Sequence, residues 1–187
     1  FESKTVNEDT IYIKMDSLGN NAGEKFYKAL DKIGNKEYLV IDIRDNGRGD
    51  HSEAVEIADL LLPEESEICF VETMKSRHYY GSDAFLFNFK KIFILLNENT
   101  ASGAEMLALS LKENLGDKVE LIGKTTAKEP IGKFYKEYYN KIELDIVTLK
   151  WSVKGKSVEA FDTYLGKYSN TSFENLDDYM TQINKLK

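Results

Sequence analysis

Apolar residues occur along the chain either in short runs or at spacings of three to four positions. These two patterns follow each other in turn, and together they predict a sheet with helices packed against it. Short apolar runs are typical of buried strands, which we expect at residues 10–15, 38–43, 68–73, 92–96 and 119–123. Apolar residues spaced by three or four positions predict helices, which we expect at residues 22–33, 54–62 and 102–115. Because strands and helices alternate over the first 125 residues, we expect an α/β fold with a mainly parallel sheet.

The rest of the chain carries weaker patterns. Residues 1–8 are polar and are expected to fray, residues 75–89 are aromatic and irregular, and residues 155–172 resemble a linker. Two further strands are expected at 134–139 and 142–153, with a turn at 140–141. No repeat or break in composition divides the chain, so we expect a single domain over 1–187. Its core would span about 10–160, and its C-terminal extension would end in a helix at about 173–187.

Charge and composition exclude several classes of protein. The net charge of −7 argues against nucleic-acid binding, which depends on basic patches. No apolar run reaches the roughly 18 residues that span a bilayer, and no signal peptide is evident. Because the chain starts at Phe1 without Met, we expect a fragment of a longer protein. The single cysteine, Cys69, is expected to be buried.

Three loops follow predicted strands and are candidates for a functional site. They span 44–50, 97–103 and 123–132. In open α/β sheets, ligands and catalytic groups gather just beyond the carboxyl ends of the strands. The three loops should therefore meet at one edge of the sheet.

Ser102 lies where a predicted strand turns into a predicted helix. The N-terminus of a helix offers free backbone N–H groups and a positive dipole end to an anion that forms there. A serine at this position could be a nucleophile. It could equally be a helix cap, because Ser102 and Glu105 have the spacing of a capping box. From the local sequence alone, the cap is the commoner role.

A serine nucleophile needs a base, and the sequence offers more than one. The two histidines are His51 and His78, and neither lies in a recognisable motif. A lysine that has lost its proton is another known base, and Lys128 lies in the loop after the next predicted strand. The Ser-x-x-Lys spacing of β-lactamase-type enzymes is absent from this chain.

The three loops resemble motifs of the carboxyl-terminal processing (tail-specific) serine proteases. Residues 38–49 are similar to that family's "hydrophobic-D-L-R-N-N-P-G-G" segment, and residues 97–105 to its "N-x-x-S/T-A-S-A-S-E" nucleophile turn. Residues 123–128 are similar to its "G-E-K-T-F-G-K" base loop. Order and spacing agree, and the resemblance covers about residues 10–160.

The resemblance implies a fold, an activity and residue roles. The fold would be an α/β core of the crotonase and Clp-protease type, without a visible peptide-binding PDZ domain. Ser102 would be the nucleophile and Lys128 the general base, with backbone N–H groups of Gly103 and of Gly49 or Arg48 forming the oxyanion hole. The substrates would be unfolded or C-terminal polypeptide segments, with no metal or cofactor involved. An extracytoplasmic, bacterial protein is implied, and it could form a homo-oligomer.

Three positions depart from the family pattern. Gly132 stands where the family often has a glutamine that orients the lysine, and Ala104 replaces its second serine. Arg48 replaces a glycine, which would cost on the order of 1 kcal/mol if the backbone there had a positive φ.

These departures leave room for other interpretations. Tyr135 or Glu137 could orient the lysine instead of the missing glutamine. The chain could also be a catalytically weak or inactive module that binds peptides on a protease fold. In a third interpretation, Ser102 only caps its helix.

Overall fold

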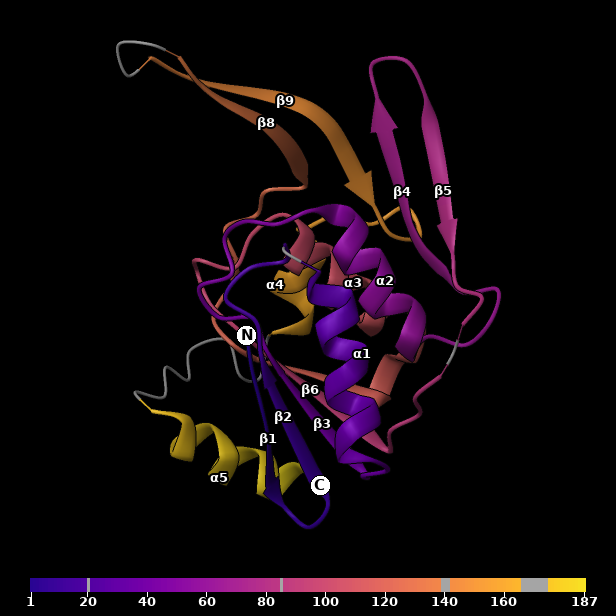
Figure 1. Cartoon of the computed structure of the whole chain (residues 1–187), viewed down its shortest axis with the longest axis vertical. Coiled ribbons are helices and arrows are strands. Elements are labelled where there is room, and N and C mark those ends of the chain that lie inside the picture. Colours follow the sequence, from indigo (N-terminus) through magenta and orange to yellow (C-terminus); the bar gives the residue numbers. More distant parts are fainter. Residues whose placement is uncertain (20, 85, 139–141, 166–174) are drawn as a thin grey trace.

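The computed structural model describes residues 1–19, 21–84, 86–138, 142–165 and 175–187, and it contains two sheets (Figure 1). The larger sheet has the order β1-β2-β3-β6-β7. Strands β2, β3, β6 and β7 run parallel, and β1 pairs with β2 antiparallel. Their bounds are β1 (Glu2–Asn7), β2 (Thr10–Lys14), β3 (Tyr38–Asp42), β6 (Lys91–Leu96) and β7 (Val119–Gly123).

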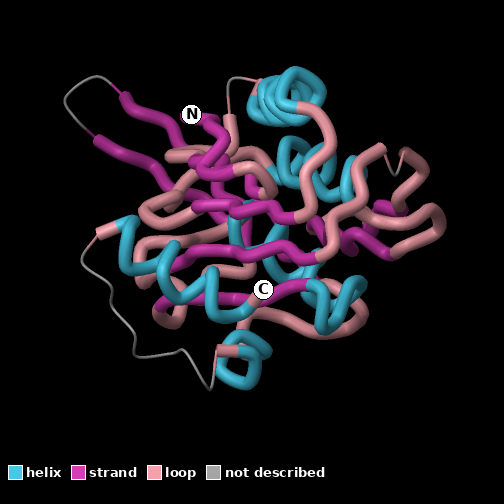
Figure 2. The backbone as a smooth tube through the Cα atoms, turned by 90° about the horizontal axis from the view of Figure 1, so that it is seen from below, coloured by secondary structure: helices cyan, strands magenta, loops and turns pink. Residues whose placement is uncertain are grey.

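Helices cover both faces of this sheet. Successive side chains of a strand point to opposite sides, so the strands contribute to a core on each face. One face packs against α1 (Ala22–Ile33), α2 (His51–Leu61) and α3 (Gly103–Leu115). The other face packs against α5 (Leu176–Leu186), which lies along the strands with the C-terminus at its end (Figure 2). In β3, for example, Leu39 and Ile41 belong to the first core and Tyr38 and Val40 to the second.

A second, antiparallel sheet extends away from the helices as two hairpins (Figure 1). Its order is β5-β4-β9-β8, with β4 (Glu67–Thr73), β5 (Arg77–Gly81), β8 (Ile131–Tyr138) and β9 (Ile142–Ser152). Cys69, Val71 and Trp151 attach the base of this sheet to the larger core. Cys69 is buried as expected, and burial raises the pKa of its thiol to about 12.

The structure confirms the mostly parallel sheet and corrects the weaker expectations. Residues 2–7 form β1 rather than a frayed end, and residues 77–81 form β5 inside the stretch expected to be irregular. The stretch expected to be a linker contains α4 (Ala160–Tyr164). The turn expected at 140–141 lies outside the described residues. A single domain over the whole chain stays a prediction.

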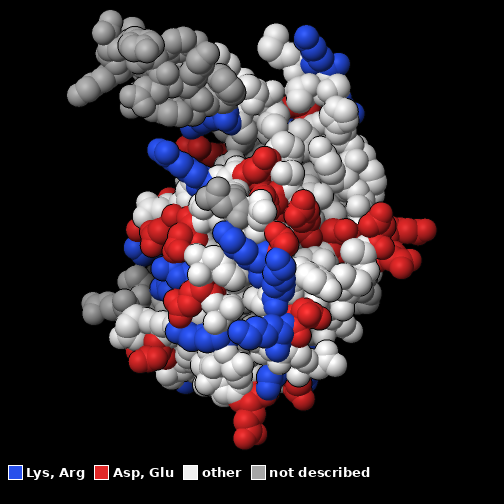
Figure 3. Space-filling model, viewed as in Figure 1, with Lys and Arg blue, Asp and Glu red and all other residues white. Residues whose placement is uncertain are grey.

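Charged side chains of both signs share the face of the molecule seen in Figure 3. Basic side chains gather over α1, with acidic side chains beside them. Among the described residues, none of the helices has the length and apolar character needed to cross a membrane.

Candidate active site

The structure brings the three predicted loops together at one edge of the larger sheet. Strands β3, β6 and β7 are parallel neighbours, so their carboxyl ends lie side by side. The loops 44–50, 97–103 and 123–132 follow these three strands directly. Parallel pairing therefore places the three candidate segments next to one another, as the sequence predicts.

Hydrogen bonds connect the first loop to the turn that precedes Ser102. The Asp45 N–H donates to Asn97 Oδ1 (3.0 Å), and the Ala101 N–H donates to the Asn46 carbonyl (3.0 Å). The side-chain amides of Asn99 and Asn97 both donate to Asp45 Oδ1 and hold the pKa of that carboxyl below its ordinary value. These contacts join two loops that are fifty residues apart in the sequence.

Ser102 has an unusual backbone conformation at the start of α3. Its φ and ψ are 55° and −119°, a region that residues with a Cβ rarely occupy. The Ser102 N–H donates to Glu105 Oε2 (2.9 Å), which is the contact expected of Glu105 in a capping box. The Ser102 hydroxyl donates to the carbonyl of Ile131, the first residue of β8 (3.0 Å). Its Oγ therefore faces the segment that follows the base loop.

Lys128 is held at two points. Its N–H donates to Glu105 Oε1 (2.8 Å), and its backbone also has a positive φ, 61°. Its side chain is 38% exposed, and Nζ forms an ion pair with Asp162 of α4 (2.7 Å). Lys128 holds the pKa of the Asp162 carboxyl below its ordinary value. Both Ser102 and Lys128 are described residues, and no hydrogen bond joins Lys128 Nζ to Ser102 Oγ.

The start of α3 lies against the loop expected to supply the second oxyanion donor. A Cβ built on Gly103 would come within 3.4 Å of the Asp50 carbonyl. A Cβ on Gly49 would lie 2.4–2.8 Å from Cβ, O and Cα of Leu18, so only glycine fits there. Within the described part of the chain, the N–H groups of Gly103, Gly49 and Arg48 donate no hydrogen bond. Gly103 is buried, whereas Arg48 and Gly49 are exposed, and their role in an oxyanion hole stays a prediction.

Arg48 does not carry the backbone strain considered from the sequence. Its φ is not positive; in the 44–50 loop, the residue with a positive φ is Asp45 (63°). Arg48 also receives a hydrogen bond, because the Leu18 N–H donates to its carbonyl (3.2 Å). The replacement of a family glycine by Arg48 is therefore compatible with the backbone of this loop.

Neither histidine contacts Ser102. His51 begins α2 and its Nδ1 lies 3.2 Å from Asp50 Oδ1. His78 lies on β5 and its Nε2 is hydrogen-bonded to Ser76 Oγ (2.8 Å). Among the described residues, no histidine is hydrogen-bonded to Ser102, which leaves Lys128 as the candidate base.

Gly132, at the position where the family pattern has a glutamine, has little room for a side chain. A Cβ on Gly132 would lie 2.7–3.1 Å from the side-chain carbons of Leu149 on the paired strand β9. A glutamine at position 132 would therefore displace Leu149. The side chains of Tyr135 and Glu137, the alternatives suggested by the sequence, lie outside the described part of the structure.

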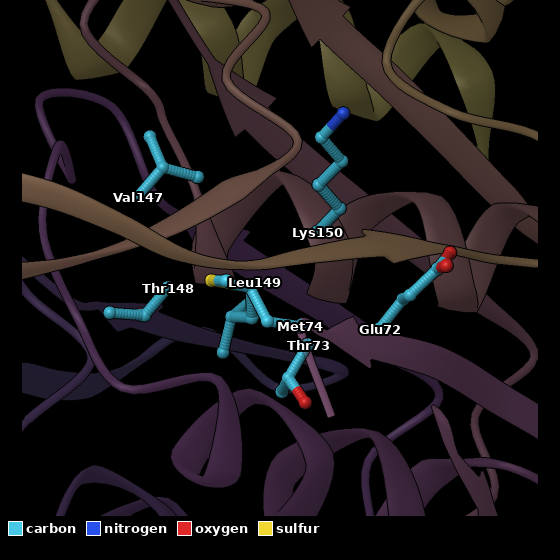
Figure 4. Close-up of a pocket in the computed structure, with 7 residues that line it drawn as sticks. All are labelled: Glu72, Thr73, Met74, Val147, Thr148, Leu149 and Lys150. Carbon is cyan, nitrogen blue, oxygen red and sulfur yellow. The ribbon is translucent and has the colours of Figure 1, made fainter. Parts of the chain in front are cut away.

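An open cavity of about 330 Å³ lies between β4 and β9 (Figure 4). It is lined by Glu72, Thr73, Met74, Val147, Thr148, Leu149 and Lys150. Leu149 and Lys150 pair with Gly132 and Ile131 of β8, and the Ile131 carbonyl is the acceptor of the Ser102 hydroxyl. The cavity is therefore one strand away from the candidate nucleophile.

Sequence reasoning missed two carboxylates at this site. Asp162 lies in the stretch expected to be a linker, and Glu105 was considered only as a local cap. The residues that were given roles by resemblance lie on loops that meet at one edge of the larger sheet. In the described part of the chain, no cluster of three or more His, Cys, Asp or Glu residues could hold a metal ion.

A family model and the curated relatives both indicate the same family for this chain. Residues 9–159 match the model described as Peptidase family S41. The chain is 30% identical over 107 residues to "Carboxyl-terminal-processing peptidase 2, chloroplastic" of Arabidopsis thaliana, covering 55% of this chain and 21% of that protein. It is 28% identical over 163 residues to "Carboxy-terminal processing protease CtpA" of Bacillus subtilis, covering 79% of this chain and 34% of that protein.

Two solved structures resemble the fold. A putative S41 protease from Bacteroides fragilis superposes with a TM-score of 0.71 at 18% identity, over 100% of this chain and 57% of that one. A photosystem II D1 C-terminal processing protease superposes with a TM-score of 0.63 at 21% identity, over 80% of this chain and 39% of that one. The chain thus spans about a fifth to a third of the length of the curated relatives named above.

Proposed function

The chain belongs to peptidase family S41, among the carboxyl-terminal processing proteases, and from this premise we propose that it carries the catalytic core of a serine endopeptidase. Ser102 would be its nucleophile and Lys128 its general base. One observation carries the proposal: the buried carboxylate of Glu105 accepts hydrogen bonds from the backbone N–H groups of both residues. Two residues of suitable chemistry are thereby held at the carboxyl ends of adjacent strands.

The proposed reaction proceeds through an acyl-enzyme. Neutral Lys128 takes the proton of the Ser102 hydroxyl while Oγ attacks the peptide carbonyl carbon. The tetrahedral oxyanion accepts hydrogen bonds from the N–H of Gly103 and that of Gly49 or Arg48, and each such donor is worth roughly 3–4 kcal/mol of barrier. Protonated Lys128 then gives its proton to the departing amine as the C–N bond breaks. Lys128 then takes a proton from water as the water oxygen attacks the ester carbon, and it returns this proton to Ser102 Oγ as the C–Oγ bond breaks and the acid product leaves.

In this mechanism, the present arrangement is a resting one. The Ser102 hydroxyl donates to the Ile131 carbonyl and Lys128 Nζ pairs with Asp162. Both side chains must exchange these partners for each other before catalysis. Hydrogen bonds between catalytic groups often tighten only when substrate is bound, so substrate binding is the natural trigger for this exchange.

The finer assignments follow from relatives and are part of the same proposal. The names of the relatives support polypeptide substrates cut at or near a C-terminus. We infer an extracytoplasmic location and a core of the crotonase and Clp-protease type, and a homo-oligomer is compatible with both. The cavity between β4 and β9 supports a binding path for substrate, because it lies beside the strand that faces Ser102.

A peptide-binding module without catalysis is the second candidate. Two observations favour it: Lys128 is paired with a carboxylate, and Gly132 offers no side chain to orient the lysine. In that case, the cavity between β4 and β9 would bind peptides, but Ser102 would not react.

Cleavage of an unfolded protein tests the proposal. The wild-type protein should degrade it, and Ser102→Ala and Lys128→Ala should each abolish detectable turnover, because each removes a group that takes part in bond making. Lys124→Ala is the matched control: Lys124 lies in the same loop and pairs with Glu98. Its loss should leave turnover near that of the wild type. Retained turnover in either site variant would exclude the assignment, whereas peptide binding without turnover would favour the module.

A further inference from the structure

Glu105 is a carboxylate in a place where carboxylates are rarely found. It lies in the first turn of α3 and its residue is 0% exposed. Burying a charged group is costly unless it is paired or hydrogen-bonded. Burial raises the pKa of the Glu105 carboxyl, while the Thr126 side chain and hydrogen bonds from backbone N–H groups act in the opposite direction. A residue retained in such a position needs a reason.

Its two oxygens accept hydrogen bonds from two segments of the chain. Oε2 accepts from the N–H of Ser102 (2.9 Å) and from the N–H of Glu129 (3.0 Å). Oε1 accepts from the N–H of Lys128 (2.8 Å). A helix cap requires only the first of these contacts. The other two reach more than twenty residues along the chain into the base loop.

The backbone on both sides of this carboxylate is strained. Ser102 and Lys128 have φ values of 55° and 61°, although both carry a Cβ. Such conformations persist only where surrounding contacts impose them. The Ala127 N–H, which donates to the Thr100 carbonyl (3.0 Å), is a further tie between the same two segments. Glu105 is the side chain that holds both strained residues at once.

We propose that Glu105 is a positioning residue that fixes the Ser102 turn and the Lys128 loop in a single arrangement. This inference rests on the proposed function, because it assigns Glu105 to the Ser102–Lys128 pair. Glu105 does not touch the substrate or transfer a proton. It sets the separation and orientation of the two backbone segments from which nucleophile and base project.

Replacement by glutamine separates this role from simple space filling. Glutamine has nearly the same shape, but one of its two terminal atoms is an NH₂ donor. Three backbone N–H groups donate to Glu105, and the Thr126 side chain also lies beside it. Whichever way the amide is turned, its NH₂ group would face at least one of these N–H groups. The base loop or the serine turn must then move.

The experiment compares Glu105→Gln with Asp59→Asn in the full chain. Asp59 is a matched control, since it also lies on a helix and its Oδ1 accepts the N–H groups of Asp83 and Ala84. Asp59 lies eight residues beyond the start of α2. It holds a different loop from the one that carries Lys128. Turnover of an unfolded protein gives kcat and KM, and amide hydrogen exchange reports on each N–H group directly.

For Glu105→Gln, we expect kcat to fall about 10²-fold with KM little changed, since a misplacement of about 1 Å can cost that much. Exchange at Lys128 and Glu129 should accelerate. In Asp59→Asn the amide oxygen can still accept both N–H groups, so exchange at Asp83 and Ala84 and kcat should all stay near those of the wild type. A wild-type kcat, or unchanged exchange at Lys128 and Glu129, in Glu105→Gln would overturn the proposal.

Two further outcomes keep the inference separate from the proposed function. If the wild type shows no turnover, the proposed function fails, but exchange at Lys128 and Glu129 still decides whether Glu105 holds the base loop. If Glu105→Gln does not fold, Glu105→Asp answers the same question, because its shorter side chain withdraws the carboxylate from that loop. Unchanged exchange in Glu105→Asp would then overturn the proposal.

Discussion

The turn that carries Ser102 and the loop that carries Lys128 are held in different ways. The turn follows a buried strand, leads into a buried helix, and is hydrogen-bonded to the 44–50 loop by backbone and side-chain groups. A hydrogen bond to Glu105 fixes the backbone of Lys128, but the Lys128 side chain ends in a partly exposed ion pair. Exposed ion pairs contribute little to stability. The fold therefore fixes the proposed nucleophile, whereas the side chain of the proposed base can change its position easily.

Among substitutions outside the Ser102–Lys128 pair, the largest effect is expected in the 44–50 loop, which is hydrogen-bonded to the Ser102 turn. Gly49→Ala would place a methyl group within 2.4–2.8 Å of Leu18, including its backbone oxygen. The 44–50 loop must shift, and the proposed oxyanion donor moves with it. We expect kcat to fall about 10²- to 10³-fold, the usual effect of losing one such donor, as measured by cleavage of an unfolded protein. An undiminished kcat would mean that this loop supplies no donor.

A smaller effect of opposite sign, a rise in kcat, is expected when the ion pair of the Lys128 side chain is removed. Asp162→Asn removes the charged partner of Lys128 Nζ, so the amine is freer to turn toward Ser102. We expect kcat to rise several-fold, with thermal stability close to that of the wild type. Lys124 and Glu98 form a similar exposed pair in the same region, so Glu98→Gln is the control and should leave kcat unchanged. A loss of activity in Asp162→Asn would instead make Asp162 an orienting residue for the lysine.

The smallest effect concerns the carboxylate shared by the Ser102 turn and the Lys128 loop. Burial raises the pKa of Glu105 in the folded state above its value in the unfolded chain. Its contribution to stability is therefore fully present at low pH and is lost as the pH rises through the folded-state pKa.

Urea unfolding of the wild type and of Glu105→Gln, at a series of pH values from acidic to neutral, measures this directly. The stability of the wild type relative to the variant should decrease as the pH rises. An increase over the same range would show that the hydrogen bonds to Glu105 outweigh its burial.

The sequence predicts which loops meet at the site better than it predicts the hydrogen bonds that join them. Ser102 and Lys128 are predicted as a pair because parallel strands must end at the same edge of a sheet, and because short motifs mark their loops. The reach of Glu105 could not be predicted, since its spacing from Ser102 satisfies a helix cap without any distant partner. Only the folded chain brings the N–H groups of Lys128 and Glu129 to its carboxylate.

Other expectations failed because polarity is an ambiguous signal. All six residues of β1 are exposed, so this edge strand has no apolar alternation to mark it. Asp162 lies in a short helix within a polar stretch and makes its contact with Lys128 through an exposed side chain. The strain considered at Arg48 is absent, while Asp45 and Lys128 carry positive φ values that their residue types did not suggest.

The most direct test of the central claim is the rate at which a serine-reactive fluorophosphonate labels Ser102, followed by intact mass and peptide mapping. In the wild type, a single adduct on Ser102 should form. In Lys128→Ala, labelling should be slower by about 10²- to 10⁴-fold, the usual contribution of a general base. Labelling elsewhere, or an equal rate in both proteins, would contradict a Ser102–Lys128 dyad.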